Sequence, residues 1–231
     1  MTIDEIPSTT EQPEVGDIAE AIQRNATDVP PMLFDVPENF LAYPLQGDPA
    51  ERQAAAMEFA REMYKNGDEE MWQAVAPTIA SAGELIASAG VEYGAMGVYD
   101  NEQGGIAICT LTVAATGSDH MDPEVAALGL REVLVRDEFN ESQWLDLPCG
   151  PGVSRITFTK YPLSPELTGK AEEAELIQGQ IQVYIPFPTG PYIAIMTMET
   201  ANMEVWAEFS RMMAMIVQSV RFPYPVEETE S

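Results

Sequence analysis

The one histidine of the chain limits the catalytic chemistry that the sequence could carry. His120 lies in a loop segment, residues 117–122, directly before a predicted helix. A hydrolase would need this imidazole as a general base for a nucleophile, either the thiol of Cys149 or the hydroxyl of Ser118. No Gly-x-Ser-x-Gly or comparable turn motif frames either nucleophile. A hydrolase that uses Cys149 or Ser118 with His120 is therefore one alternative, and a solvated loop histidine is the other.

Motifs for binding a cofactor or a metal are missing from the sequence. It contains no Gly-x-x-x-x-Gly-Lys-Ser/Thr loop, and no Gly-x-Gly-x-x-Gly follows a predicted strand. Residues 100–104 begin like a calcium loop but lack its later ligands and its closing glutamate. We expect a hairpin turn there. The sequence thus predicts no cofactor, no metal site and no assigned catalytic residue.

The two cysteines lie in different sequence contexts. Cys109 is part of an alternating apolar run, which predicts a buried thiol. Cys149 lies in the turn sequence Pro-Cys-Gly-Pro-Gly. The sequence leaves open whether the two form a disulfide.

The composition is that of a folded but very acidic protein. Of 231 residues, 38 are acidic and 11 are basic, giving a formal charge of −27, while 45% are hydrophobic. A field of this sign repels nucleic-acid phosphates and anionic lipid headgroups, so we expect neither as a partner. A basic protein partner, a cation or simple solubility are all compatible with the charge.

The charge and proline distribution predicts one domain between two tails. Residues 1–31 form an acidic, proline-punctuated tail, 32–223 a single domain, and 224–231 a second acidic tail. The first residues lack the basic and apolar regions of a secretory signal, which predicts a cytoplasmic protein. No apolar run approaches the roughly 18 residues that would span a bilayer, so we expect no membrane insertion.

Hydrophobic periodicity predicts an α+β fold. Helices are expected at 49–66, 68–90, 123–135 and 202–220, the first capped by Asp48 and the last by Asn202, and strands at 91–99, 106–115, 143–147, 153–161, 176–187 and 192–199. The order lacks the regular strand–helix alternation of a parallel sheet. It favours an antiparallel sheet flanked by helices, with the C-terminal helix packed on the sheet.

Methionine is over-used near the end of the chain, which suggests two interpretations. Six of the 13 methionines lie between residues 196 and 215. They could fill the core, or they could form an adaptable apolar surface for a partner. The second interpretation predicts an interaction surface that includes Met196, Met198, Met212 and Met215.

The last segment resembles the C-terminal half of PsbP-like domains, including the LpqN-type proteins of actinobacteria. A strand ends at Tyr184-Ile185-Pro186, a turn leads into the strand 192–198, and a helix closes with Ser219-Val220-Arg221-Phe222. The motif Pro-x-x-Phe at 37–40 also fits the start of that family, and the resemblance covers residues 32–222. It implies a curved antiparallel sheet and a binding or assembly role without catalysis.

These observations together favour a non-enzymatic protein-binding or assembly factor with an acidic surface, and a basic protein is a compatible partner. The alternatives are the hydrolase described above and a structural homo-oligomer.

Overall fold

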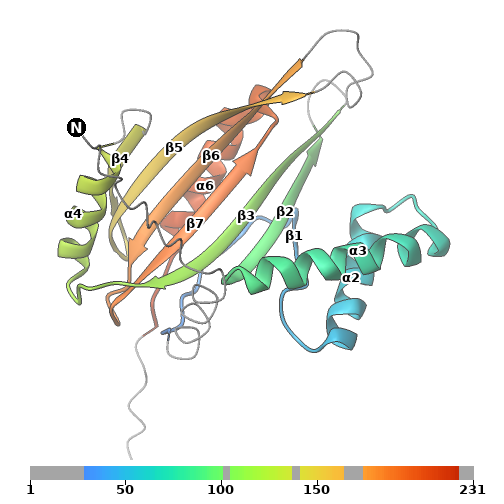
Figure 1. Ribbon diagram of the computed structural model, residues 1–231, viewed down its shortest axis with the longest axis horizontal. Helices are drawn as coiled ribbons and strands as arrows, with labels where there is room; N and C mark the ends of the chain where they lie inside the picture. The colour runs from blue at the N-terminus through green and yellow to red at the C-terminus, as the bar shows by residue number, and fades with distance from the viewer. Residues whose placement is uncertain (1–28, 101–104, 137–140, 164–173, 224–231) are drawn as a thin grey trace, which may run out of the picture.

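A single seven-stranded antiparallel sheet organises the part of the chain that the computed structural model describes, residues 29–100, 105–136, 141–163 and 174–223 (Figure 1). Its strand order is β1-β2-β3-β7-β6-β5-β4. The strands are β1 (Phe40–Ala42), β2 (Val91–Asp100), β3 (Ile106–Gly117), β4 (Glu141–Leu147), β5 (Gly150–Leu163), β6 (Ala174–Pro186) and β7 (Tyr192–Thr200). The helices are α2 (Pro49–Met63), α3 (Glu69–Ser88), α4 (Pro123–Leu134) and α6 (Trp206–Gln218), preceded by a 3-10 turn, η1 (Met203–Val205). The predicted α+β class is confirmed.

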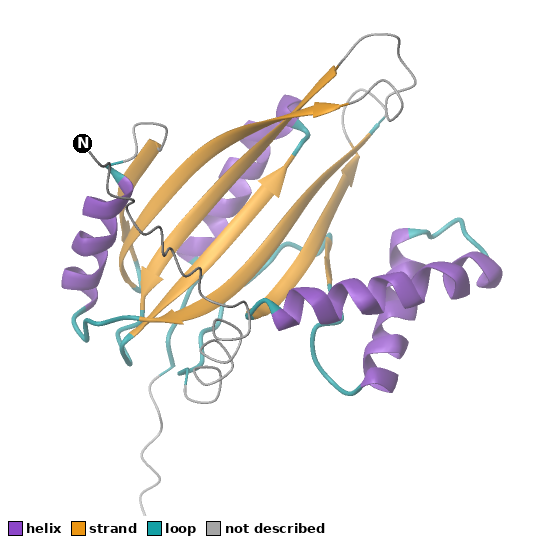
Figure 2. Ribbon diagram, viewed as in Figure 1, coloured by secondary structure: helices purple, strands orange, loops and turns teal. Residues whose placement is uncertain are grey.

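The C-terminal helix α6 covers one face of the sheet, as predicted (Figure 2). Its inward residues Phe209, Met213, Ile216 and Val217 are buried against the sheet. In β7 the alternation of a strand points Met196 and Met198 at this helix, and their exposure is 0% and 1%. The prediction that these two methionines line an interaction surface is therefore wrong, because they form part of the core.

Helix α4 packs on the opposite face, but only near the β4 edge. Ala127 and Leu134 bury Val153 of β5 between them, with Leu130, Trp144 and Tyr184 at the margin. The other apolar residues of α4 point away from the sheet: Val125, Leu128 and Val133 are exposed. Helix α4 thus covers the β4 end of this face, and no described helix covers the rest.

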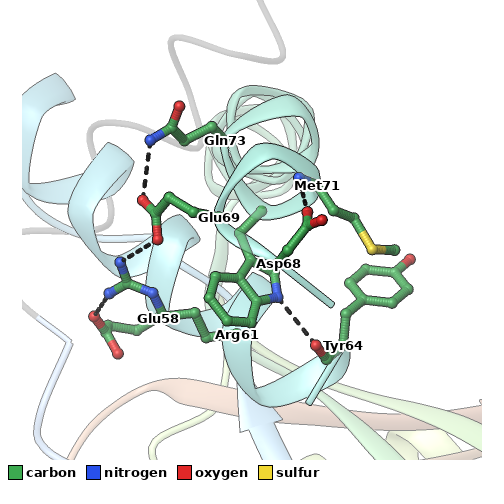
Figure 3. A network of polar contacts seen from close by, with 8 residues as sticks. Glu58, Arg61, Tyr64, Asp68, Glu69, Met71 and Gln73 are labelled. Atoms are coloured by element: carbon green, nitrogen blue, oxygen red, sulfur yellow. Dashed lines mark hydrogen bonds and ion pairs between the residues drawn. The ribbon is translucent and has the colours of Figure 1, made fainter. Parts of the chain in front are cut away.

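Helices α2 and α3 form a helical hairpin in which the two helices cross beside the β1 edge of the sheet (Figure 1), and polar contacts hold the turn that joins them (Figure 3). Asp48 and Glu51 make the predicted capping box of α2, and Asp68 accepts from the N–H of Met71 to cap α3. Arg61 donates to Glu58 of its own helix at 2.7 Å and, across the turn, to Glu69 of α3 at 3.3 Å. The indole of Trp72 donates to the carbonyl of Tyr64 at 3.0 Å. These exposed pairs fix the hairpin turn more than they add stability.

A glycine lets α3 pack closely on the segment that follows β1. Gly83 is buried, and a Cβ at this position would lie 2.5 Å from the Pro44 carbonyl oxygen. On the same side, the rings of Tyr43 and Phe59 stack with centroids 5.2 Å apart. The hairpin of α2 and α3 is therefore joined to the sheet through residues 43–45 and the start of β2.

The described chain contacts the core just before the predicted start of the domain at residue 32. Residues 1–28 of the predicted N-terminal tail and all of the predicted C-terminal tail, 224–231, lie outside the described residues. Val29, however, packs against the core, three residues before the expected start of the domain. With Met32, Phe34, Tyr93 and Phe187 it lines an apolar cavity of about 340 Å³. Among the described helices, none has the length and apolarity to span a bilayer.

Two mid-helix glycines offer a matched test of the α3 contact. We expect Gly83→Ala to lower the free energy of unfolding by about 1–3 kcal/mol, because the added methyl group meets backbone that cannot move aside. Gly129→Ala in α4 is the control, since nothing lies within 4 Å of a Cβ there. It should raise the free energy of unfolding by roughly 0.5–1 kcal/mol through helix propensity. Urea denaturation measures both, and equal effects of the same sign would contradict the packing described for α3.

Candidate interaction surface

The face of the sheet opposite α6 is a broad polar surface in its centre. Because side chains alternate along a strand, the neighbours of the buried core residues point to this side. Strands β3, β7, β6 and β5 present mainly hydroxyl and amide side chains here: Thr110, Thr112, Thr197, Glu199, Gln178, Gln180, Gln182, Thr157 and Arg155. Each of these residues is half-buried. No described helix lies over this region, which we call the open face (Figure 1).

The carboxylate of Glu199 is the hydrogen-bonding centre of the open face. Gln178 Nε2 donates to one of its oxygens at 2.9 Å, and Gln180 Nε2 donates to the other. Gln180 in turn accepts from Thr157 Oγ1 at 3.4 Å. Among the described residues, no lysine or arginine forms an ion pair with Glu199. The carboxylate is thus oriented by two neutral amide donors rather than by an ion pair.

A pocket of about 410 Å³ opens beside Glu199, where β7 ends. Its lining comes from β3, β6, the end of β7 and the turn after β7: Ile108, Cys109, Thr110, Gln178, Glu199, Thr200, Ala201 and Asn202. Thr200 Oγ1 donates to the carbonyl of Ile108 at 2.7 Å, and Asn202 Oδ1 accepts from its N–H at 2.9 Å. Asn202 was expected to cap the last helix. It makes no side-chain cap bond, because its side-chain oxygen accepts from the N–H of Ile108 in β3 instead.

The remaining two predicted surface methionines lie on the other side of the molecule. Met212 is half-buried on α6, where its sulfur accepts from the Tyr99 hydroxyl at 3.2 Å. Met215, also on α6, is 63% exposed. Because α6 covers the face opposite Glu199, neither residue can share a surface with the pocket. The four methionines therefore do not form one interaction surface.

The residues of the hydrolase alternative are not organised as a catalytic group. The N–H of His120 donates to Ser118 Oγ at 3.1 Å, which is a local turn contact. Cys149 lies in the turn between β4 and β5, where burial raises the pKa of its thiol and so disfavours the thiolate. Within the described ranges, no hydrogen bond joins the His120 imidazole to Ser118 or Cys149. The contacts lend the hydrolase hypothesis no support.

The structure shows how the two cysteines and the potential metal-binding side chains are placed. Both Cys109 and Cys149 are free thiols, and Cys109 is fully buried, as predicted. In the described part of the chain, no three His, Cys, Asp or Glu side chains converge as a metal site would require. Four residues of the predicted hairpin turn, 101–104, lie outside the described residues.

Comparisons with known proteins leave the family of the chain open. No family model matches the sequence, and no curated protein matches it. A crystal structure of a protein from Bacteroides thetaiotaomicron VPI-5482 aligns over 57% of this chain and 46% of that one, at 7% identity and a TM-score of 0.30. The chain thus spans less than half the length of that protein, and the similarity establishes no common fold or function. The resemblance to PsbP-like domains stays a prediction.

Glu199 was not among the residues singled out from the sequence, although part of the signal was present. In the predicted strand 176–187, alternation places Gln178, Gln180 and Gln182 on one polar side. Glu199 lies near the end of a strand in which Met196 and Met198 point to the core, so its side chain points away from the core. Only the pairing of β6 with β7 brings the glutamines and the glutamate together.

Thiol labelling tests whether either cysteine is activated. In the folded protein we expect Cys149 to react with Ellman's reagent more slowly than a free thiol. Cys109 should be slower still, because burial raises its pKa to about 12 from an ordinary 9.0. Cys149→Ser isolates Cys109, and unfolding in urea should make both thiols react rapidly. Labelling of Cys149 faster in the folded than in the unfolded protein would contradict this and favour the hydrolase.

Proposed function

We propose that the protein is a non-enzymatic binding or accessory factor that takes a basic protein partner on the open face of its sheet. The observation that carries this proposal is the Glu199 carboxylate, which two glutamine amides hold beside a pocket without a described cation. A carboxylate oriented in this way accepts a guanidinium or ammonium group with little further ordering.

The electrostatics of the whole chain favour the same class of partner. A formal charge of −27 attracts a basic protein over distances up to the Debye length and raises the rate of association. At the surface itself, Glu199 is half-buried, so its charge is screened less than that of a fully exposed carboxylate. Long-range attraction and local recognition therefore act together.

The hydroxyl and amide groups around Glu199 suit a polar protein interface. Threonine and glutamine both donate and accept, so Thr110, Thr197 and Gln182 can satisfy groups of either kind on a partner. The centre of the face also lacks the high apolar content that homodimer interfaces have.

Self-association is a second candidate function, favoured by the outward side of α4. Leu128 is 47% exposed and Val133 62% exposed, although both belong to an amphipathic helix that already packs on the sheet. A groove of about 440 Å³ runs beside Leu128 and Val135, with Arg131 and Arg136 at its margin. An apolar surface of this kind is a common site of contact between protein copies.

Replacement of Glu199 tests the proposed function. We expect Glu199→Gln to weaken the binding of a basic partner roughly tenfold, because it removes one charge-assisted hydrogen bond. Glu62→Gln on α2 is the matched control, since it removes the same charge from an exposed site away from the open face. Co-purification from the native cell at rising salt, followed by titration of the recovered partner, measures the difference. Equal loss in the two variants would indicate that only net charge matters and would contradict recognition by the open face.

Light scattering separates the second candidate from the first. If α4 mediates self-association, the wild-type chain should run as a dimer or larger species and Leu128→Asp as a monomer. Glu199→Gln should leave the mass unchanged. A monomeric wild-type chain at all accessible concentrations would contradict the oligomer.

A further inference from the structure

We infer that the early end of β7 leaves a slot between β3 and β6 that accepts an extended peptide strand from the partner. The inference rests on the proposed function and deepens it, because it states the conformation and the side-chain pattern of what binds. The occupant is an extended segment with a lysine or arginine beside Glu199 and apolar residues at alternate positions beyond it.

The strand register defines the slot. The last pairs that β7 makes are Thr110 with Glu199 on one side and Gly179 with Thr200 on the other. Beyond that point β3 continues to Ile106 and β6 to Ala174. No described strand lies between these two extensions, as Figure 1 shows beyond the arrowhead of β7. The slot is thus the continuation of β7 in the sheet.

Backbone groups of β3 point into the slot. The N–H and C=O of Ile108 are directed there, since Asn202 and Thr200 bond them from that side. In an antiparallel strand every second residue points its backbone groups to the same neighbour, so those of Ile106 face the slot as well. The side chains of Thr200 and Asn202 thus make the two hydrogen bonds to Ile108 that one residue of a neighbouring strand would make.

The opposite wall follows from the same alternation. Because the backbone groups of Ile108 face β7, those of Thr110 do as well, so Thr110 and Glu199 form a hydrogen-bonded pair. The backbone groups of Thr200 are therefore turned toward Gly179 of β6. Two and four residues back along β6, the backbone groups of Ile177 and Glu175 then face the slot. Since β3 and β6 flank β7, they are two strand spacings apart where it ends, roughly 9–10 Å. That is the width for one inserted strand.

The side chains around the slot set the chemistry of the occupant. On the open face, Ile106 is 61%, Ile108 40% and Leu176 38% exposed, so the end of the slot away from β7 is apolar. The end next to β7 has the Glu199 carboxylate. A strand whose outward side chains run from basic to apolar over alternate positions matches both ends. A second copy of the chain is a poorer match, because both copies carry a charge of −27.

A short synthetic peptide tests the slot in the full-length protein. The probe is a capped octapeptide in which every second residue is threonine. The positions between them carry first one lysine and then valines, and binding is measured by calorimetric titration. One control peptide carries N-methyl groups on the backbone amides that would face the slot walls, and another has glutamate in place of lysine. We expect N-methylation to weaken binding at least tenfold, since it removes backbone donors and leaves the side chains intact.

Protein variants locate the binding. Ile106→Ser should weaken the peptide several-fold, whereas Val133→Ser, of matched exposure on α4, should not. Glu199→Gln should weaken the lysine peptide, and it should strengthen the glutamate peptide or leave it unchanged, because it removes the repulsion between two carboxylates.

The possible results separate the slot from the proposed function. If the N-methylated peptide binds as tightly while Glu199→Gln still weakens binding, the slot is wrong and the basic-partner proposal stands. If no peptide binds, or if the chain self-associates through the slot, the inference is overturned. If Glu199→Gln changes neither peptide nor partner binding, the proposed function fails as well.

Discussion

The structure depends on the packing of α6 against the sheet. Phe209 and Met213 of the helix belong to the same buried cluster as Met196 and Met198 of β7. Burial of such side chains stabilises a fold by about 1.5–3 kcal/mol each. Gly179 has no side chain, so Trp206 at the start of α6 can lie directly against β6. Helix α6 covers one face of the sheet. The other face therefore contacts solvent mainly through polar side chains, except where α4 packs on it.

That constraint explains why the candidate site is polar and where it lies. The turn after β7 must carry the chain from the sheet to α6, so β7 ends at Thr200 while β3 and β6 run on. The same departure brings Asn202 and Thr200 against β3 and leaves Glu199 beside a pocket. The feature that stabilises the core and the feature proposed for binding therefore have a common origin.

Local patterns were sufficient to predict most of the elements but not their partners. The alternation in 176–187 and the capping residue Asp48 lie within short windows of sequence, and the strand and the helix start that they predict are present in the structure. The methionines of β7 were ambiguous, because the alternation divides a strand into two faces without saying which one a helix will cover. The surroundings of Glu199 depend on the register of β6 against β7. Which apolar residues of α4 are exposed depends on the side of the helix that packs on the sheet. Such long-range pairings are not encoded in the spacing of neighbouring residues.

The most direct test of the account is amide hydrogen exchange of the full-length chain, free and in complex with the basic partner. The account predicts that the amides of Ile106 and Ile177 exchange readily in the free protein and become protected in the complex. The amides of Met196 and Met198, already in the central strand, should change little. Protection confined to α4 or to the exposed side of α6, with Ile106 and Ile177 unchanged, would contradict recognition at the open face.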